Sequence, residues 1–252
     1  MEKKQNNAYL LRQWALVVIL WIILLFGFSR LIRQGNYLPI IVFIAITAVA
    51  IAGWVAFKTL SQFNRLLKAS SPQPLIDYYN KRLGRLPLLP NKDAILAFSK
   101  SLIYTLYGDF ENAKTEVNKV NWEQKLPLVK AQKLFLQALW AYLETHDFQR
   151  GVKLAREARG LTEVSSSFPG ARRSLGTYDM VIEIGELLSG NSEPNLVHNL
   201  EKRFQQFPVL MKLMAAWGLE GFYNQSGRPE QGRKMRELLT SLAPYCKGLA
   251  SL

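Results

Sequence analysis

Hydrophobic residues are unevenly distributed along the chain, and the pattern changes near residue 58. The stretch from Gln13 to Ser29 has no charged residue, and a second uncharged run extends from Gln34 to Phe57. Neither run has a polar face, so each is predicted to be a helix surrounded by lipid. At ~1.5 Å per residue, both are about long enough to cross a ~30 Å hydrocarbon core. After residue 58, apolar positions recur at helical spacing without strand-like alternation.

The short segment between the two runs ends in the turn signal Gly35-Asn36, which predicts a transmembrane helical hairpin. Six basic residues flank the outer ends of the hairpin, and two, Arg30 and Arg33, lie between the spans. This bias predicts a bacterial-type plasma or internal membrane protein with both termini and the downstream domain in the cytoplasm. A cleavable signal peptide is the rival interpretation of the first run. It is disfavoured because no small-x-small cleavage site follows Phe28 and a second span comes directly after it.

Prolines predict a domain boundary after the membrane segments. Ser70-Ser-Pro-Gln-Pro74 should end any helix that continues from the second span. The predicted organisation is therefore a cytoplasmic tail at 1–12, two transmembrane helices at 13–57, an amphipathic basic neck and linker at 58–90, and a helical repeat domain at 91–252. Basic residues of the neck are candidate contacts for anionic lipid, although a solvated face would have the same composition. These candidates are Lys58, Arg65, Lys68, Lys81, Arg82 and Arg85.

A local pattern recurs in the last segment: an aromatic residue stands four positions before a turn residue, and a small residue five positions after it. The three good copies are Tyr104, Gly108 and Ala113; Tyr142, His146 and Gly151; and Tyr223, Gly227 and Gly232. A degenerate copy keeps the turn glycine, Gly190, and the four turn residues are 38, 44 and 37 residues apart. A ring beside a small residue lets two helices approach closely, so we expect stacked helix pairs. The predicted pairs are Lys92–Tyr107 with Glu111–Val120, Pro127–Thr145 with Phe148–Gly160, Ser174–Leu188 with Pro194–Gln206, and Val209–Gln225 with Pro229–Ala243.

The segment Gly108-Asp-Phe-Glu-Asn-Ala113 resembles the turn and second-helix start of a tetratricopeptide repeat (TPR). The resemblance implies an all-α chain in which the hairpin is followed by an α-solenoid of about four TPR-like helix pairs. It departs from the family pattern where His146 replaces the turn glycine, and the repeats exceed the usual period. Two spans followed by such helices are also similar in layout to bacterial inner-membrane proteins of the HemY type, by analogy only.

The resemblance further implies that a protein segment binds on the concave face formed by the first helix of each pair. Counting back 3, 6, 10 and 13 positions from each turn residue selects one helix face, which is strongly apolar. Such a face suits an apolar or amphipathic segment. It would instead be core if the neck or the C-terminal tail folds into the groove. The candidate groove residues are Phe98, Leu102, Lys133, Leu136, Trp140, Thr177, Met180, Trp217 and Asn224.

Charge and chemistry refine this picture only slightly. Residues 59–252 carry 26 Lys and Arg against 18 Asp and Glu, which favours anionic partners: lipid headgroups, an acidic protein or nucleic acid. The single cysteine, Cys246, excludes an internal disulfide. His146 and His198 have no second ligand at a metal-like spacing, and no phosphate-binding or nucleophile motif occurs. We therefore expect no cofactor, no metal and no enzymatic activity.

The sequence as a whole predicts a membrane-anchored scaffold or adaptor that holds a protein partner at the cytoplasmic membrane face, for example during assembly of a membrane complex. The alternative is a basic peripheral domain that binds anionic lipid or nucleic acid, with nucleic acid the less favoured of the two. Salt dependence separates these hypotheses, because phosphate-driven binding weakens steeply with salt and apolar binding does not.

Overall fold

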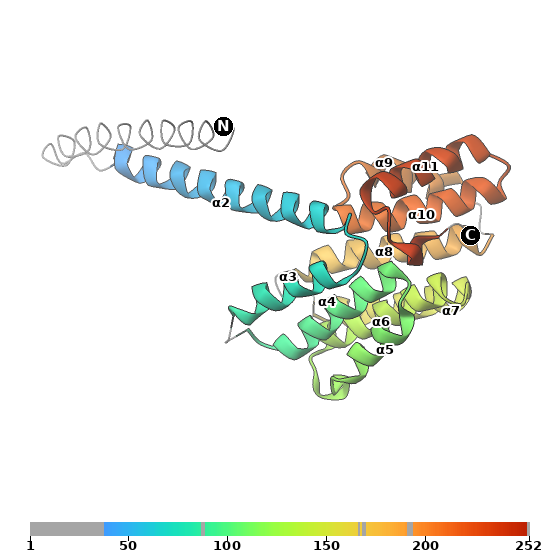
Figure 1. Cartoon of the computed structure of the whole chain (residues 1–252), viewed down its shortest axis with the longest axis horizontal. Helices are drawn as coiled ribbons and strands as arrows, with labels where there is room; N and C mark the ends of the chain where they lie inside the picture. Colours follow the sequence, from blue (N-terminus) through green and yellow to red (C-terminus); the bar gives the residue numbers. More distant parts are fainter. Residues whose placement is uncertain (1–37, 87–88, 166, 168–169, 191–193, 251–252) are drawn as a thin grey trace, which may run out of the picture. The chain divides into compact units, whose positions relative to one another are not determined.

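The computed structural model describes residues 38–250 except 87–88, 166, 168–169 and 191–193. These residues form ten α-helices and two short 3-10 helices, and none of the residues so described is in a strand. The chain divides into two compact units, Met1–Ser61 and Gln62–Leu252. The predicted all-α class is therefore confirmed for the described part of the chain (Figure 1).

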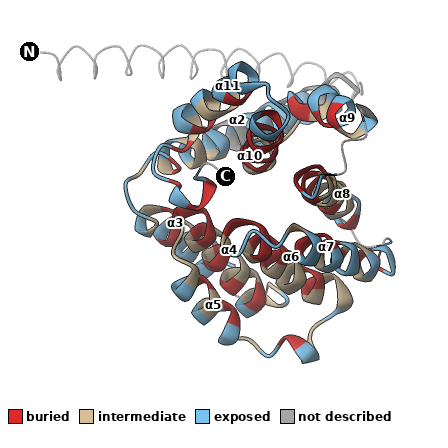
Figure 2. Ribbon diagram, turned by 90° about the vertical axis from the view of Figure 1, so that its right-hand side faces the viewer, coloured by how far each residue is buried: buried red, intermediate tan, exposed pale blue. Residues whose placement is uncertain are grey.

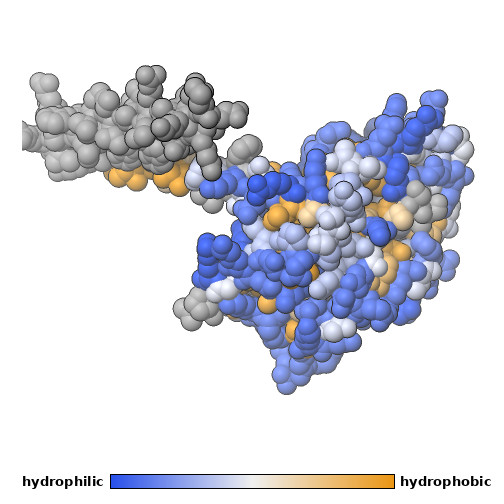
Figure 3. Space-filling view, in the orientation of Figure 1, coloured by the Kyte–Doolittle hydropathy of each residue, from blue (hydrophilic) through white to orange (hydrophobic). Residues whose placement is uncertain are grey.

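The first described helix, α2 (Leu38–Leu66), coincides with much of the second uncharged run. Its stretch Ile44–Leu66 is long and apolar enough to cross a membrane, judged by length and composition, and the apolar 18-residue window within it contains no buried residue. Large side chains such as Val49 and Trp54 are exposed, and Figure 3 shows hydrophobic side chains along part of this helix. The tail at 1–12, the first uncharged run and the hairpin turn lie outside the described residues.

The end of α2 belongs to the second compact unit. Phe63 and Leu66 pack against its core, and Leu67 is completely buried there. The chain bends over residues 67–72, around Pro72, and continues as α3 (Gln73–Gly84), whose Leu75 and Ile76 are also buried in the core. Residues 62–86, which the sequence places in a neck, thus pack into the same compact unit as the helices that follow.

Eight further helices form four consecutive pairs. They are α4 (Lys92–Tyr107) with α5 (Phe110–Asn118), α6 (Pro127–Leu143) with α7 (Phe148–Glu163), α8 (Ala171–Leu188) with α9 (Pro194–Phe204), and α10 (Val209–Gln225) with α11 (Pro229–Leu242). Gly108, His146, Gly190 and Gly227 follow the first helix of each pair and have φ of +79°, +54°, +91° and +72°. All four turn residues of the repeated pattern therefore adopt the left-handed conformation that ends a helix.

The second helices of two of the pairs begin at side-chain caps. Asp109 accepts a hydrogen bond from the backbone N–H of Asn112, and Asp147 accepts one from that of Arg150. Each cap satisfies a donor that the first helical turn leaves without a partner, so both helices start directly after the turn.

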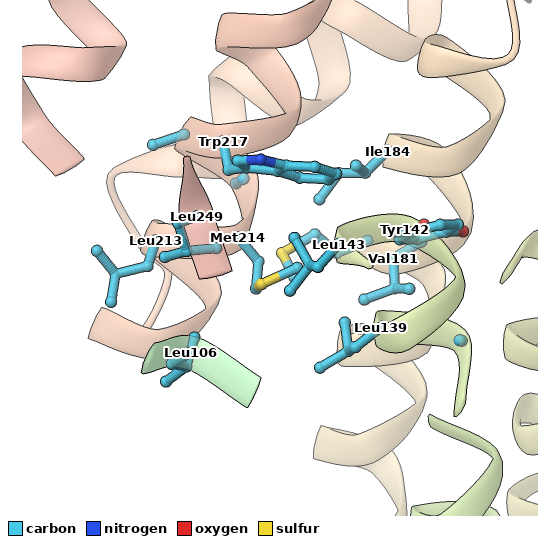
Figure 4. Close-up of a cluster of buried hydrophobic side chains, with 14 of the residues drawn as sticks. Leu106, Leu139, Tyr142, Leu143, Val181, Ile184, Leu213, Met214, Trp217 and Leu249 are labelled. Carbon is cyan, nitrogen blue, oxygen red and sulfur yellow. The ribbon is translucent and has the colours of Figure 1, made fainter. Parts of the chain in front are cut away.

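Tyr142 shows the packing of a ring against small residues most clearly. A Cβ atom added to Gly151 of α7 would lie 2.0 Å from its Cε1, and one added to Gly185 of α8 would lie 2.1 Å from its hydroxyl oxygen. The hydroxyl donates to the backbone oxygen of Val181 at 3.0 Å. One buried ring therefore fixes α6, α7 and α8 together, as Figure 4 shows for Tyr142 and Val181. At Gly232 the pattern differs, because its nearest neighbours are Asn224 and Glu220 and not Tyr223.

The first helices of the pairs are neighbours in space. Helix α6 contacts both α4 and α8, and α10 contacts α8. We call α4, α6, α8 and α10 the inner helices, because α5, α7, α9 and α11 lie outside them in Figure 2. The 3-10 helix η2 (Lys247–Leu249) contacts α4 and α10, so the C-terminal segment joins the first pair to the last.

Candidate functional site

A cavity of about 330 Å³ lies among the inner helices. All four inner helices contribute to its wall, together with Pro208 just before α10. Its lining contains no charged residue. The lining residues are Phe98, Leu102, Leu106, Gln132, Phe135, Leu139, Ser174, Thr177, Tyr178, Met180, Pro208, Leu210, Met211 and Met214.

A second apolar cavity, of about 110 Å³, extends this space along α4. The two cavities share the side chains of Phe98, Leu102, Leu106 and Leu210 in their walls. The smaller one reaches Phe63 in the last turn of α2.

Polar groups in the cavity wall are few. The Thr177 hydroxyl donates to the backbone oxygen of Arg173 at 3.2 Å. Burial raises the pKa of the Tyr178 hydroxyl. The side-chain oxygen of Gln132, by contrast, is buried without a hydrogen-bond partner among the described residues. A buried amide oxygen without a partner is costly, so the side-chain oxygen of Gln132 can accept a hydrogen bond from a ligand that enters the cavity.

Four of the nine predicted groove residues line this cavity: Phe98, Leu102, Thr177 and Met180. Two others, Leu136 and Trp217, are buried in the core. The remaining three do not line the cavity. Trp140 donates its indole N–H to the hydroxyl oxygen of Thr105 at 2.8 Å, Asn224 is exposed, and Lys133 is half-buried next to the lining residue Gln132.

In α6, the predicted groove residues differ from the residues that line the cavity, and the difference has a geometric cause. The lining residues Gln132, Phe135 and Leu139 each precede a predicted residue by one position. After α4, the backbone N–H of Asp109 donates to Tyr104, five residues back, whereas after α6 that of Asp147 donates to Ala141, six residues back. The turn at His146 thus contains one extra residue. Counting back from it selects a face rotated by about 100° from the one that lines the cavity.

The C-terminal tail covers the face of α10 that carries Trp217. The indole N–H of Trp217 donates to the backbone oxygen of Ala250 at 3.1 Å, and Arg236 donates to that of Leu249 at 2.8 Å. Figure 4 shows Leu249 near Trp217 and Leu213. Burial raises the pKa of the neighbouring Cys246 thiol to about 12. Tail packing therefore makes Trp217 a core residue.

The six basic residues predicted to contact anionic lipid, Lys58, Arg65, Lys68, Lys81, Arg82 and Arg85, are all exposed. None of them forms an ion pair with a carboxylate of the described residues. Lys58 lies over the ring of Trp54, and Arg82 donates to the Tyr78 hydroxyl. These side chains are available to anions.

Comparison with known proteins gives no match for this chain. No protein-family model matches this chain, and no curated protein or solved structure matches it either. Within the described residues, no group of three or more His, Cys, Asp or Glu side chains could hold a metal ion. The apolar cavity is therefore the feature on which a function can be argued.

Proposed function

We propose that this protein is a membrane-anchored adaptor that holds an apolar segment of a protein partner at the cytoplasmic face of a membrane. The observation that carries the proposal is the uncharged cavity of about 330 Å³ walled by all four inner helices. This volume lies in the range of ligand sites, roughly 300–1,000 Å³, and is large enough for anchoring side chains from a bound helix.

The cavity wall is suited to binding of variable apolar side chains. Three of the five methionines of the chain, Met180, Met211 and Met214, line it. Methionine is flexible and polarisable, so such a wall can adapt its shape to an inserted side chain. With Tyr178 as its single titratable residue, this wall favours recognition over acid–base chemistry.

In this proposal, the membrane anchor keeps the bound partner near the membrane. Helix α2 contains the candidate span and continues without interruption to Leu66, where its last turn packs into the core of the second unit. A partner bound by the inner helices is then kept at a high effective concentration near the membrane, so modest affinity suffices. The proposal includes the two-span hairpin and the cytoplasmic location of both termini. Both are argued from the distribution of basic residues around the uncharged runs.

We further propose that the four helix pairs form a TPR-like solenoid. Left-handed residues at all four turns and the close approach of Tyr142 to Gly151 support repeated helix pairs.

A second candidate function is attachment to anionic lipid through the exposed basic residues of α3, Lys81 and Arg82, and the following Arg85. It would complement the anchor and would weaken steeply with salt.

Photo-cross-linking in intact membranes tests the proposal. We expect a photoreactive diazirine amino acid in place of Thr177, in the cavity wall, to yield a discrete protein adduct. The same residue in place of Thr240, exposed on α11, should yield none. Filling the cavity by Leu102→Trp should abolish the adduct at position 177. Equal labelling at both positions, or adduct formation that Leu102→Trp leaves unchanged, would exclude the cavity as the binding site.

A further inference from the structure

Every acidic residue on the inner helices is already engaged by a basic residue elsewhere in the chain. There are five of them, Asp93, Asp179, Glu183, Glu186 and Glu220. They pair respectively with Lys125, Arg159, Arg203, Arg156 and Arg236. The inner helices therefore offer no unpaired carboxylate to a ligand.

Several basic residues of the same helices have no such partner. Among the described residues, no carboxylate lies within ion-pair distance of Lys92, Lys133, Arg172, Arg173 or Lys212. Two of these five are direct sequence neighbours of residues that line the cavity: Lys133 follows Gln132, and Arg173 precedes Ser174. The ammonium of Lys212 instead donates to the backbone oxygen of Gln205 at 3.2 Å and lies over the ring of Phe204.

Four of the fourteen lining residues also lie close to helix N-termini. Ser174 and Thr177 are in the first two turns of α8, and Leu210 and Met211 are in the first turn of α10. The N-terminal end of a helix carries a partial positive charge, which adds to that of the lysine and arginine side chains. The cavity is therefore apolar inside, and the charged side chains of the four helices that lack an ion-pair partner among the described residues are all basic.

We infer that the partner segment which binds this cavity is an amphipathic helix whose apolar face is flanked by acidic residues. The inference rests on the proposed function, because it specifies the partner of the same cavity. Apolar side chains of the helix fill the space between the inner helices, and its carboxylates meet Lys133 and Arg173. A helix with the same apolar face and basic flanks is rejected by like charge. The side-chain oxygen of Gln132 accepts a hydrogen bond from a polar group of the ligand.

Two designed peptides test this inference. They share one apolar helix face and differ only in having Glu or Lys at the flanking positions. Binding of the fluorescently labelled peptides to the full-length protein in a zwitterionic detergent is followed by fluorescence anisotropy. We expect the Glu-flanked peptide to bind at least about tenfold more tightly than the Lys-flanked one, and to weaken as salt is raised.

Reversing the charge of two basic residues tests whether they distinguish the two peptides. The double variant Lys133→Glu with Arg173→Glu should reduce binding of the Glu-flanked peptide by about tenfold or more and improve binding of the Lys-flanked peptide. The matched control, Arg233→Glu with Lys234→Glu, makes the same change in net charge at exposed positions of α11 and should leave both affinities unchanged. Circular dichroism verifies that both variants are folded.

The outcomes separate this inference from the proposed function. Equal affinities for the two peptides, together with no effect of charge reversal, overturn the acidic-partner inference and leave the adaptor proposal intact. If neither peptide binds but anionic vesicles do, and charge reversal abolishes vesicle binding, Lys133 and Arg173 bind lipid and the inference is wrong. If no peptide binds and the adduct at position 177 is also absent, both proposals fail.

Discussion

Replacing Gly151 with alanine is expected to lower the free energy of unfolding by about 2–3 kcal/mol. The added methyl group would lie 2.0 Å from Cε1 of Tyr142, whose ring is completely buried. The ring has little freedom to move, because its hydroxyl is bonded to Val181 and lies against Gly185 on the other side. The clash therefore has to separate α6 from α7. Urea unfolding of the full-length protein in detergent, followed by circular dichroism, measures the effect.

Gly160→Ala provides the matched control in the same helix. No atom lies within 4 Å of a Cβ added at Gly160, so this change should stabilise the protein by up to ~1 kcal/mol through helix propensity alone. If Gly151→Ala and Gly160→Ala have the same effect, close packing of Tyr142 does not hold the second pair together. This result would contradict the interpretation that a ring packed against a small residue is the repeated packing unit.

Gly248→Ala is expected to release the C-terminal tail from the helices. A Cβ at this position would lie 2.1 Å from the backbone oxygen of Thr105 and 2.9 Å from that of Leu106. Both atoms belong to the backbone of α4, which cannot move aside as a flexible side chain would. The tail residue must move instead, and its contacts with Trp217 and Arg236 should be lost with it.

The thiol of Cys246 reports tail release directly, because it is the single cysteine of the chain. Burial raises its pKa to about 12, so at pH 8 the docked tail presents very little reactive thiolate. In Gly248→Ala the thiol should become accessible and its pKa should fall toward that of a free cysteine, which predicts at least about a tenfold faster reaction with a thiol reagent. Gly176→Ala, where an added Cβ meets no atom within 4 Å, should leave the rate unchanged. An unchanged rate in Gly248→Ala would show that the tail is not held at α4.

The helix pairs and their turns could be predicted from the sequence because local chemistry determines them. Gly108, Gly190 and Gly227 mark positions with positive φ, which glycine adopts without strain, and the spacing identifies His146 as their counterpart. The second helices starting after Asp109 and Asp147 follow from side-chain capping. These features depend on a few neighbouring residues.

The cavity wall could be predicted only in part, because it depends on register and on distant contacts. Phe98, Leu102, Thr177 and Met180 follow from counting back along helices whose turns are regular. In α6 the extra residue before Asp147 rotates the face, so Phe135 and Leu139 replace Leu136 and Trp140. The burial of Trp217 under the tail depends on residues over 30 positions away, which no local pattern encodes. The packing of Leu67 into the core is equally non-local.

The most direct test of the binding cavity is a methyl NMR spectrum of the full-length protein with ¹³C-labelled methionine, recorded with and without the tighter-binding of the two designed peptides. Met180, Met211 and Met214 line the cavity, whereas Met235 lies on α11 outside it. If the cavity receives the apolar face of the partner helix, the methyl signals of these three residues shift on binding and that of Met235 does not. If the peptide binds while the three cavity methyls keep their positions, the inner helices do not form the binding site and the account is wrong.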